Sequence, residues 1–92
     1  MKGTVLQEAQ RIVYGAREKA YSHPSRDYGK TAKIWTGILL EKLKPGMEIT
    51  PTEAVLMMVG MKISREVFRH GRDNLIDAAG YIACAERIEE GK

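Results

Sequence analysis

Three basic residues recur along one predicted helix, at Lys62, Arg65 and Arg69. Residues three and four positions apart share one face of an α-helix. Lys62 follows an uncharged, apolar stretch, so its stem should be buried and its charged tip should need a partner, for which Asp77 on the next helix is the natural candidate. Two interpretations stay open, and both can hold at once: a structural ion pair between two helices, or the floor of an anion-binding site.

A second group of polar residues, Asp27-Tyr28-Gly29-Lys30, opens another predicted helix. Free backbone N–H groups at a helix start attract anions, Gly29 allows close approach, and Lys30 adds positive charge. Tyr28 can stack on a base or donate its hydroxyl. The alternative is an ordinary helix cap at Asp27 beside an exposed lysine, because Asp27 would repel a phosphate placed directly on the helix terminus.

The third group lies on the last predicted helix, where Asp73, Asp77 and Tyr81 recur every four residues and share one face. Paired carboxylates of this kind could hold Mg²⁺ through oxygen. The alternative is that Asp73 caps the helix while Asp77 pairs with Lys62 or Arg65. The chain has no Walker-type glycine loop, no Ser/His/Asp arrangement at a known motif spacing and no helix with the pattern of a DNA reader. A nucleic-acid duplex is therefore not expected as a partner.

Four helices must position these groups, and no segment alternates as a strand does. Residues 16–27 read as irregular, which leaves room for a short helical turn over 16–20. Each of the four expected helices has its own start or end signal. The first covers 5–14, with Thr4 and Gln7 at capping-box spacing before it and Gly15 as a left-handed terminator. The others cover 27–43, capped by Asp27; 51–65, capped by Thr50 with Pro51 and Glu53 following; and 73–89, capped by Asp73.

The helix over 51–65 is apolar nearly all round, which predicts either a central helix or an oligomer interface. Gly60 opposite Gly80 would let the third and fourth helices approach closely. A lone bundle of 92 residues cannot readily bury such a helix, so we expect a homodimer or a larger homo-oligomer. On the second helix, four apolar residues are expected to face inward: Ile34, Trp35, Ile38 and Leu39.

Composition favours a single small cytoplasmic domain. Charged residues make up 29% of the chain and no apolar run reaches the roughly 18 residues of a membrane span, so a membrane protein is excluded. The start lacks the apolar stretch of a secretory signal. Net charge is only +3, but basic residues dominate between Arg11 and Lys33, which favours an anionic partner. Cys84 is the only cysteine and is expected to be a small core residue.

With these residues in place, the chain resembles small uncharacterised phage and prophage proteins related to the MazG-like all-α nucleotide pyrophosphohydrolases. The resemblance covers nearly the whole chain and implies a four-helix MazG-like bundle in an intertwined homo-oligomer. Members of that superfamily hold Mg²⁺ with glutamates on two helices and a Glu-x-x-Asp motif, and cleave nucleotides to monophosphate and pyrophosphate. The residues that carry the resemblance are Glu8-Ala9, His23-Pro24, Asp27-Tyr28-Gly29, Trp35, Met61-Lys62-Ile63, Arg65, Arg72-Asp73-Asn74, Asp77 and Gly80-Tyr81.

The chain departs from the superfamily where the metal should bind. Asn74-x-x-Asp77 stands in place of Glu-x-x-Asp, and the preceding helix carries Lys62 and Arg65 with only Glu66 nearby. A cation-rich face repels the metal and attracts phosphate directly. The resemblance therefore implies a nucleotide pocket, while these departures from the superfamily argue against hydrolysis and against a metal cofactor.

The leading hypothesis is a phage-type nucleotide-binding protein that sequesters a nucleotide signal made by host immunity. Lys62, Arg65 and Arg72 would hold phosphates, helped by Lys30 and bordered by Asp77. Tyr28, Trp35 or Tyr81 would contact the base, and Asn74 would read its edge or a ribose hydroxyl. One alternative is a pyrophosphohydrolase with a reduced Mg²⁺ site built from Glu66, Asp73 and Asp77. The other is a structural or protein-interaction module without a nucleotide ligand.

Overall fold

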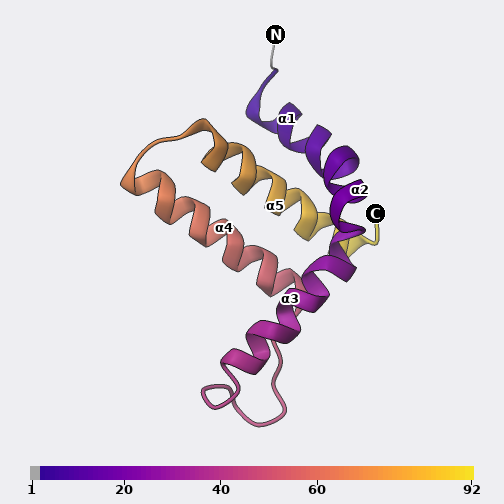
Figure 1. Cartoon of the computed structure of the whole chain (residues 1–92), viewed down its shortest axis with the longest axis vertical. Helices are drawn as coiled ribbons and strands as arrows, with labels where there is room; N and C mark the ends of the chain where they lie inside the picture. Colours follow the sequence, from indigo (N-terminus) through magenta and orange to yellow (C-terminus); the bar gives the residue numbers. More distant parts are fainter. Residues whose placement is uncertain (1–2) are drawn as a thin grey trace.

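The computed structural model describes residues 3–92, and this part of the chain is all-helical without a strand. Its first segment consists of α1 (Val5–Arg11), a π-helical turn η1 (Ile12–Ala16) and α2 (Arg17–Tyr21). It is followed by α3 (Pro24–Ile38), α4 (Pro51–Phe68) and α5 (Arg72–Glu90), as Figure 1 shows. The predicted all-α class is confirmed, whereas the MazG-like arrangement and the oligomer stay predictions.

The first helical segment is longer than the sequence suggested. It begins as expected, because Thr4 and Gln7 form a capping box at the start of α1. The predicted end at Gly15 is wrong: Gly15 lies inside the π-helical turn, and the chain stays helical to Tyr21. The segment ends at Ser22, which adopts a left-handed φ of 67°. The expected irregular stretch over 16–27 is therefore mostly helical.

The helix α3 starts three residues before the predicted cap. His23 is the N-cap, its ring Nδ1 accepts the Ser25 N–H at 3.1 Å, and Pro24 takes the first helical position. Asp27 is not a cap; it lies in the first turn. The far end is shorter than predicted, because the helix stops at Ile38 and residues 39–42 form turns.

In the α4–α5 hairpin, the predicted N-cap of α4 is confirmed and the predicted N-cap of α5 is wrong. Thr50, Pro51 and Glu53 start α4 with a capping box, as expected. The helix continues to Phe68, three residues past the predicted end. Asp73 does not cap α5: Gly71 is the N-cap residue without a side-chain cap, and Asp73 is exposed in the first turn.

The core is organised around α5, which contacts α1, η1, α3 and α4, so that α5 lies between α4 and the first segment in Figure 1. Val13, Tyr28, Val55 and Cys84 form the buried cluster, which confirms Cys84 as a core residue. The prediction of α4 as the central helix is wrong for a single chain, since α4 leaves a long apolar stripe exposed.

The predicted pairing of Gly60 with Gly80 is also wrong. A Cβ at Gly80 would lie 3.5 Å from Val13 Cγ2, whereas a Cβ at Gly60 would meet no heavy atom within 4 Å. Gly80 therefore lets η1, rather than α4, approach α5.

The far half of α3 and the loop after it project from the rest of the molecule, as Figure 1 shows. Along this arm Ile34 and Ile38 are exposed, against the prediction that they face inward, while Trp35 and Leu39 are half-buried. The reason is that α4 covers only one side of α3. None of the described helices is long and apolar enough to cross a membrane.

Candidate functional site

Arg17 is the centre of the most elaborate polar cluster in the described chain. It is the first residue after the π-helical turn and points toward α3 and α5. Its Nη2 donates to Asp27 Oδ2 at 2.9 Å and also to the Tyr28 hydroxyl. The guanidinium carbon lies 4.9 Å from the centre of the Tyr21 ring and 5.0 Å from that of Tyr28, within the range of cation–π attraction.

Two tyrosines on different helices meet beside this arginine. The rings of Tyr28 on α3 and Tyr81 on α5 pack edge to face, with centroids 6.2 Å apart and planes at 83°. This geometry is the favoured arrangement for an aromatic pair. Arg17 also lies 6.0 Å from the Tyr81 ring centre, so that one guanidinium connects α2, α3 and α5.

A cavity of about 240 Å³ opens beside Arg17, between the first helical segment and α5. Apolar side chains and a glycine form most of its wall, while Arg17, Asp77 and Tyr81 contribute polar groups. The lining residues are Ala9, Ile12, Val13, Arg17, Ile76, Asp77, Gly80, Tyr81 and Cys84.

Burial favours the protonated form of two groups beside this cavity, the Tyr28 hydroxyl and the Cys84 thiol. It raises the pKa of the Tyr28 hydroxyl, which Arg17 only partly offsets, and it raises the pKa of the Cys84 thiol. Burial alone would lower the pKa of Arg17, but the neighbouring Tyr28 and Asp27 raise it overall. At neutral pH the cluster therefore holds a cation, a neutral phenol and a neutral thiol.

The predicted ion pair between α4 and α5 is present. Lys62 Nζ lies 2.8 Å from Asp77 Oδ2, and the lysine side chain is only 13% exposed. Because Asp77 also lines the cavity, the pair connects Lys62 to the Arg17 cluster. Of the predicted site residues, Asp77 and Tyr81 line this cavity, while Tyr28 packs against Tyr81 and Lys62 pairs with Asp77.

The remaining predicted phosphate ligands are not brought together in the same way. Arg72 is held by the Glu8 carboxylate and by the Gly3 carbonyl at 3.0 Å. Arg65 is exposed and has no carboxylate partner among the described residues. Trp35 is half-buried on the α3 arm. The proposed phosphate set of Lys62, Arg65 and Arg72 therefore has two members already paired with acids.

The three acids of the predicted Mg²⁺ site are not assembled into one. Glu66 accepts the Gly71 N–H at 2.9 Å and the Asn74 amide at 3.3 Å, and His70 bonds to its other oxygen. These bonds, that of Gly71 first, lower the pKa of Glu66. Residues 3–92 contain no group of three acidic, histidine or cysteine side chains that could hold a metal ion. Glu66 and Asn74 instead stabilise the turn between α4 and α5.

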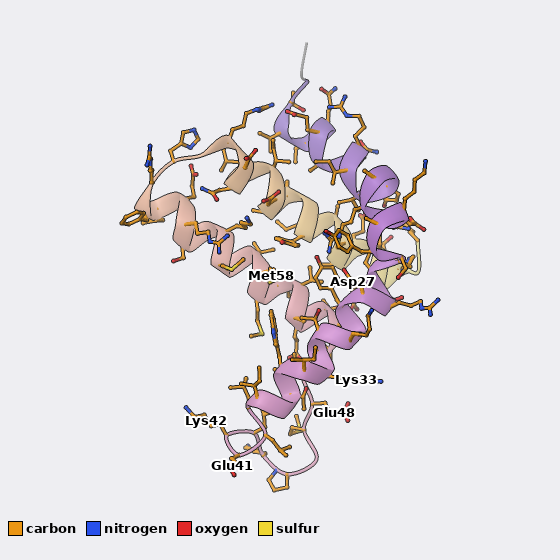
Figure 2. All side chains as sticks on the ribbon, in the orientation of Figure 1. Asp27, Lys33, Glu41, Lys42, Glu48 and Met58 are labelled. Atoms are coloured by element: carbon orange, nitrogen blue, oxygen red, sulfur yellow. The ribbon has the colours of Figure 1, made fainter. Side chains whose placement is uncertain are left out.

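A second cavity, which we call the basic hollow, lies at the junction of α2 and α3. Its volume is about 440 Å³ and it is lined by Ser22, Ser25, Arg26, Gly29, Lys30 and Lys33. In the described chain none of its three cations has a carboxylate partner. Figure 2 shows Lys33 projecting from α3 on the side away from α4.

The backbone contribution predicted for this region is wrong. The N–H groups of Arg26 and Asp27 both donate to the His23 carbonyl, at 3.0 and 3.1 Å. Tyr28, Gly29 and Lys30 lie inside the helix, where N–H groups bond to preceding carbonyls. An anion in the basic hollow would therefore be held by side chains and not by a helix terminus.

Sequence reasoning placed Arg17 in a basic stretch but missed its role. A usable signal was present: Ala9, Val13 and Arg17 follow one another at intervals of four, so an arginine continues the buried face of a helix. A charged residue on a buried face requires partners, and Asp27 supplies one.

The chain is similar to phage proteins over nearly its full length. A family model described as a domain of unknown function, DUF6378, matches residues 4–89. The Gene 55 protein of Mycobacterium phage D29 is 38% identical over 91 residues, which cover 98% of this chain and 56% of that protein. For the Gene 55 protein of Mycobacterium phage L5 the identity is 28% over 87 residues, covering 94% and 53%.

The chain spans about half the length of these curated relatives. No solved structure matches it. The predicted resemblance to phage proteins is confirmed at this level, and the link to the MazG-like superfamily stays a prediction.

Proposed function

The chain belongs to the DUF6378 family of unknown function, and on that premise we propose that it binds a phosphate-bearing nucleotide without hydrolysing it. The observation that carries the proposal is the basic hollow. Arg26, Lys30 and Lys33 surround a cavity of about 440 Å³ and have no acidic partner in the described chain. Unneutralised cations around one concave surface attract and hold a phosphate.

The composition of the basic hollow suits a phosphate ester. Arginine binds phosphate through two parallel N–H donors, while lysine contributes a mobile point charge. The hydroxyls of Ser22 and Ser25 can donate further hydrogen bonds, and Gly29 leaves space for a bulky anion. Of the sequence-predicted ligands, Lys30 is the one that belongs to this site.

The face formed by Lys62 and Arg72 supports the proposal less well than the sequence suggested. Asp77 and Glu8 already neutralise these two cations. A phosphate would have to displace a partly buried ion pair, and removing one partner from such a pair is costly. We therefore assign phosphate binding to the basic hollow rather than to the α4–α5 face.

For a phage, a non-hydrolytic nucleotide binder could sequester a nucleotide signal of host immunity in the host cytoplasm. This part of the proposal follows from the phage relatives and from the resemblance described above. It predicts tight binding and slow release, with no product formed.

Calorimetric titration with nucleoside mono- and triphosphates, cyclic dinucleotides and inorganic phosphate tests the proposal. We expect Lys30→Ala/Lys33→Ala to weaken nucleotide binding at least about tenfold, because each charged contact contributes about 1 kcal/mol or more. Lys42→Ala/Lys44→Ala removes the same charge from the loop after α3, where Figure 2 shows Lys42, and should bind normally. Absence of binding by every nucleotide, or equal weakening in both variants, would contradict the proposal.

The enzyme alternative is tested with the same ligands and Mg²⁺. Incubation followed by product analysis should yield no monophosphate or pyrophosphate under the binding proposal. Turnover that is abolished by Asp77→Ala would instead favour a pyrophosphohydrolase. In a single chain Glu66, Asp73 and Asp77 form no metal-holding group, which gives this alternative less support.

The interaction-module alternative has support from the exposed apolar surface of α4. Val67 and Phe68 are 82% and 91% exposed, which is unusual for large apolar side chains. We propose that a second copy of the chain covers this surface, so that the protein is a homo-oligomer. Nucleotide binding and self-association are compatible, since the basic hollow lies on α3.

A further inference from the structure

The cavity beside Arg17 is separate from the basic hollow, and the proposed phosphate binding makes no use of it. The two share no lining residue: the cavity is lined by residues of α1, η1 and α5 and by Arg17 of α2, and the basic hollow by Ser22 and residues of α3. Polar side chains from three helices, Arg17, Tyr28 and Tyr81, also meet beside the cavity. It therefore requires an explanation of its own.

The cavity offers hydrogen-bond donors that the protein leaves unused. Arg17 uses Nη2 for Asp27 and Tyr28, and its guanidinium also bonds to the Cys84 side chain, whereas no oxygen of the described chain accepts from its Nε and Nη1 groups. An arginine carries five N–H donors in a fixed plane. The described side chains include no fully buried nitrogen or oxygen without a hydrogen bond, so any Arg17 donor that has no partner is at least partly exposed.

Acceptors are present on the facing helix. Asp77 bonds to Lys62 through Oδ2, which leaves Oδ1 available, and the Tyr81 hydroxyl has no described partner. A hydroxyl can donate and accept. The cavity thus presents donors from α2 and acceptors from α5.

The charges of the cavity are balanced, and this decides the kind of ligand. Asp27 pairs with Arg17 at 2.9 Å, and Lys62 pairs with Asp77 at 2.8 Å. Both ion pairs are neutral overall, so neither needs a bound ion to balance its charge. An uncharged ligand that bonds to both groups fits this environment better than a phosphate does.

The size and wall of the cavity restrict the ligand further. Its volume of about 240 Å³ is below the roughly 300–1,000 Å³ typical of sites for drug-sized ligands, so one ring system fits and a whole nucleotide does not. Ile12, Val13 and Ile76 supply apolar walls, and the missing side chain of Gly80 leaves the floor open. A flat, mostly apolar ring with polar edges matches this shape.

We propose that this cavity binds one uncharged purine-type base, with Arg17 donating to acceptors on one edge and Asp77 accepting from N–H groups on another. Purines place ring-nitrogen or oxo acceptors close to amino or ring N–H donors, and arginine and carboxylates are common partners for these two kinds of group. Tyr81 supplies an additional hydroxyl contact. The proposal is independent of phosphate binding in the basic hollow.

The test uses nucleosides that carry no phosphate. Titration with guanosine and adenosine, followed by ligand NMR and calorimetry, should detect binding, while cytidine and uridine should bind at least about tenfold more weakly. Gly80→Ala should reduce purine binding at least about tenfold, because the new methyl group occupies the cavity floor. Its Cβ lies 3.5 Å from Val13, an ordinary contact, so the variant should fold.

Gly37→Ala is the matched control, since it introduces the same methyl group on α3 where no heavy atom lies within 4 Å. It should bind purine nucleosides as the wild type does, and so should Lys30→Ala/Lys33→Ala. No purine binding, equal binding of pyrimidines, or unchanged binding in Gly80→Ala would each overturn the inference. Nucleotide binding that depends on Lys30 and Lys33 would survive any of these results.

Discussion

Burial determines the chemistry of Cys84, whose side chain is fully enclosed beside the Arg17 cavity. Desolvation raises the pKa of its thiol, so little thiolate forms at neutral pH. The thiolate is the reactive form, and reagents have no access to the sulfur in the folded chain. Cys84 is therefore a wall of the cavity and not a nucleophile.

We predict that Cys84 reacts with a thiol reagent such as DTNB only when the chain unfolds. In native buffer the reaction should be at least about a hundredfold slower than in denaturant, because the thiol is both buried and protonated. Following absorbance over time in the two conditions measures this ratio. Rapid reaction in native buffer would show that the cavity opens readily to solvent.

Glu66 makes stability depend on pH. Hydrogen bonds from Gly71 and His70 lower its pKa in the folded chain. A carboxyl group with a lowered folded pKa adds stability above its ordinary pKa of 4.5, and this stability is lost as the pH falls through the folded value.

We therefore predict that Glu66→Gln flattens the loss of stability on the acid side. Glutamine keeps an oxygen for the Gly71 N–H but cannot ionise. Urea unfolding at neutral pH and at about pH 4 should show a smaller difference for this variant than for the wild type. Glu48→Gln, an exposed loop residue that Figure 2 shows, is the control and should follow the wild-type curve. Parallel curves for all three proteins would contradict the role of Glu66.

For single residues, the sequence predicted a contact where a charged side chain lies in an apolar stretch and therefore needs a partner. Lys62 after an apolar stretch required an acid, and Asp77 supplied it. The partner of Arg72 could not be predicted, because Glu8 is 64 residues away in sequence and only the tertiary fold joins them. Arg17 was missed because its spacing from Ala9 and Val13 indicates a buried face but does not identify its partners on α3 and α5.

At the scale of elements, the π-helical turn η1 determines which way the side chains of α2, the next part of the same helical segment, face. A π turn contains one residue more than an α turn, which changes the facing of later residues by about 100°. Arg87 on α5 holds this turn, because its Nη1 donates to the Val13 carbonyl at 3.2 Å and its guanidinium lies 4.6 Å from the Tyr14 ring centre. The same side chain donates through Nε to the Lys92 carbonyl at 2.6 Å.

Replacing Arg87 should therefore destabilise the protein strongly. We predict that Arg87→Leu lowers the free energy of unfolding by about 3 kcal/mol, since the side chain is only 4% exposed and its removal breaks hydrogen bonds to the Val13 and Lys92 carbonyls and leaves Glu18 without its partner. Chemical denaturation measures the change. Glu18→Gln is the control: its carboxylate lies 2.6 Å from Arg87 Nη2 but is 43% exposed, so we expect a loss of at most about 1 kcal/mol. Equal losses would assign the effect to the ion pair alone.

Helix starts were predictable where the signal is local. The capping boxes at Thr4 and Thr50 were recognised because their two partners are three residues apart. The start of α3 was misplaced because Asp27 is a better cap by residue type than His23. Its carboxylate is instead used by Arg17, a contact between two helices that residue preferences cannot reveal.

At the scale of the whole molecule, the chain is extended for its length. Its radius of gyration is 14.2 Å, against about 12 Å for a compact domain of this size. The α3 arm accounts for the difference, and the loop after it is held to α3 where the Ile49 N–H donates to Thr36 Oγ1 at 2.9 Å. The exposed Ile34 and Ile38 give this arm an apolar surface that a partner chain could cover.

The apolar stripe of α4 also indicates a partner chain. Leu56, Gly60, Ile63 and Val67 recur at intervals of four and three, so they share one face, and all four are exposed. Gly60 has open space where a side chain would be, which allows another helix to approach closely. The stripe has the pattern of a helix–helix interface whose second helix lies outside the single chain.

We predict that the purified protein has the mass of a homodimer or a larger homo-oligomer in light scattering coupled to gel filtration. Ile63→Glu should reduce this mass toward that of one chain, because a charge in a buried apolar interface is costly. Ser64→Glu adds the same charge one position away, off the stripe, and should keep the wild-type mass. Helical content by circular dichroism should be equal in the two variants, which separates dissociation from unfolding. A wild-type protein that elutes as a single chain at all concentrations would mean that the exposed stripe is not covered by a second copy.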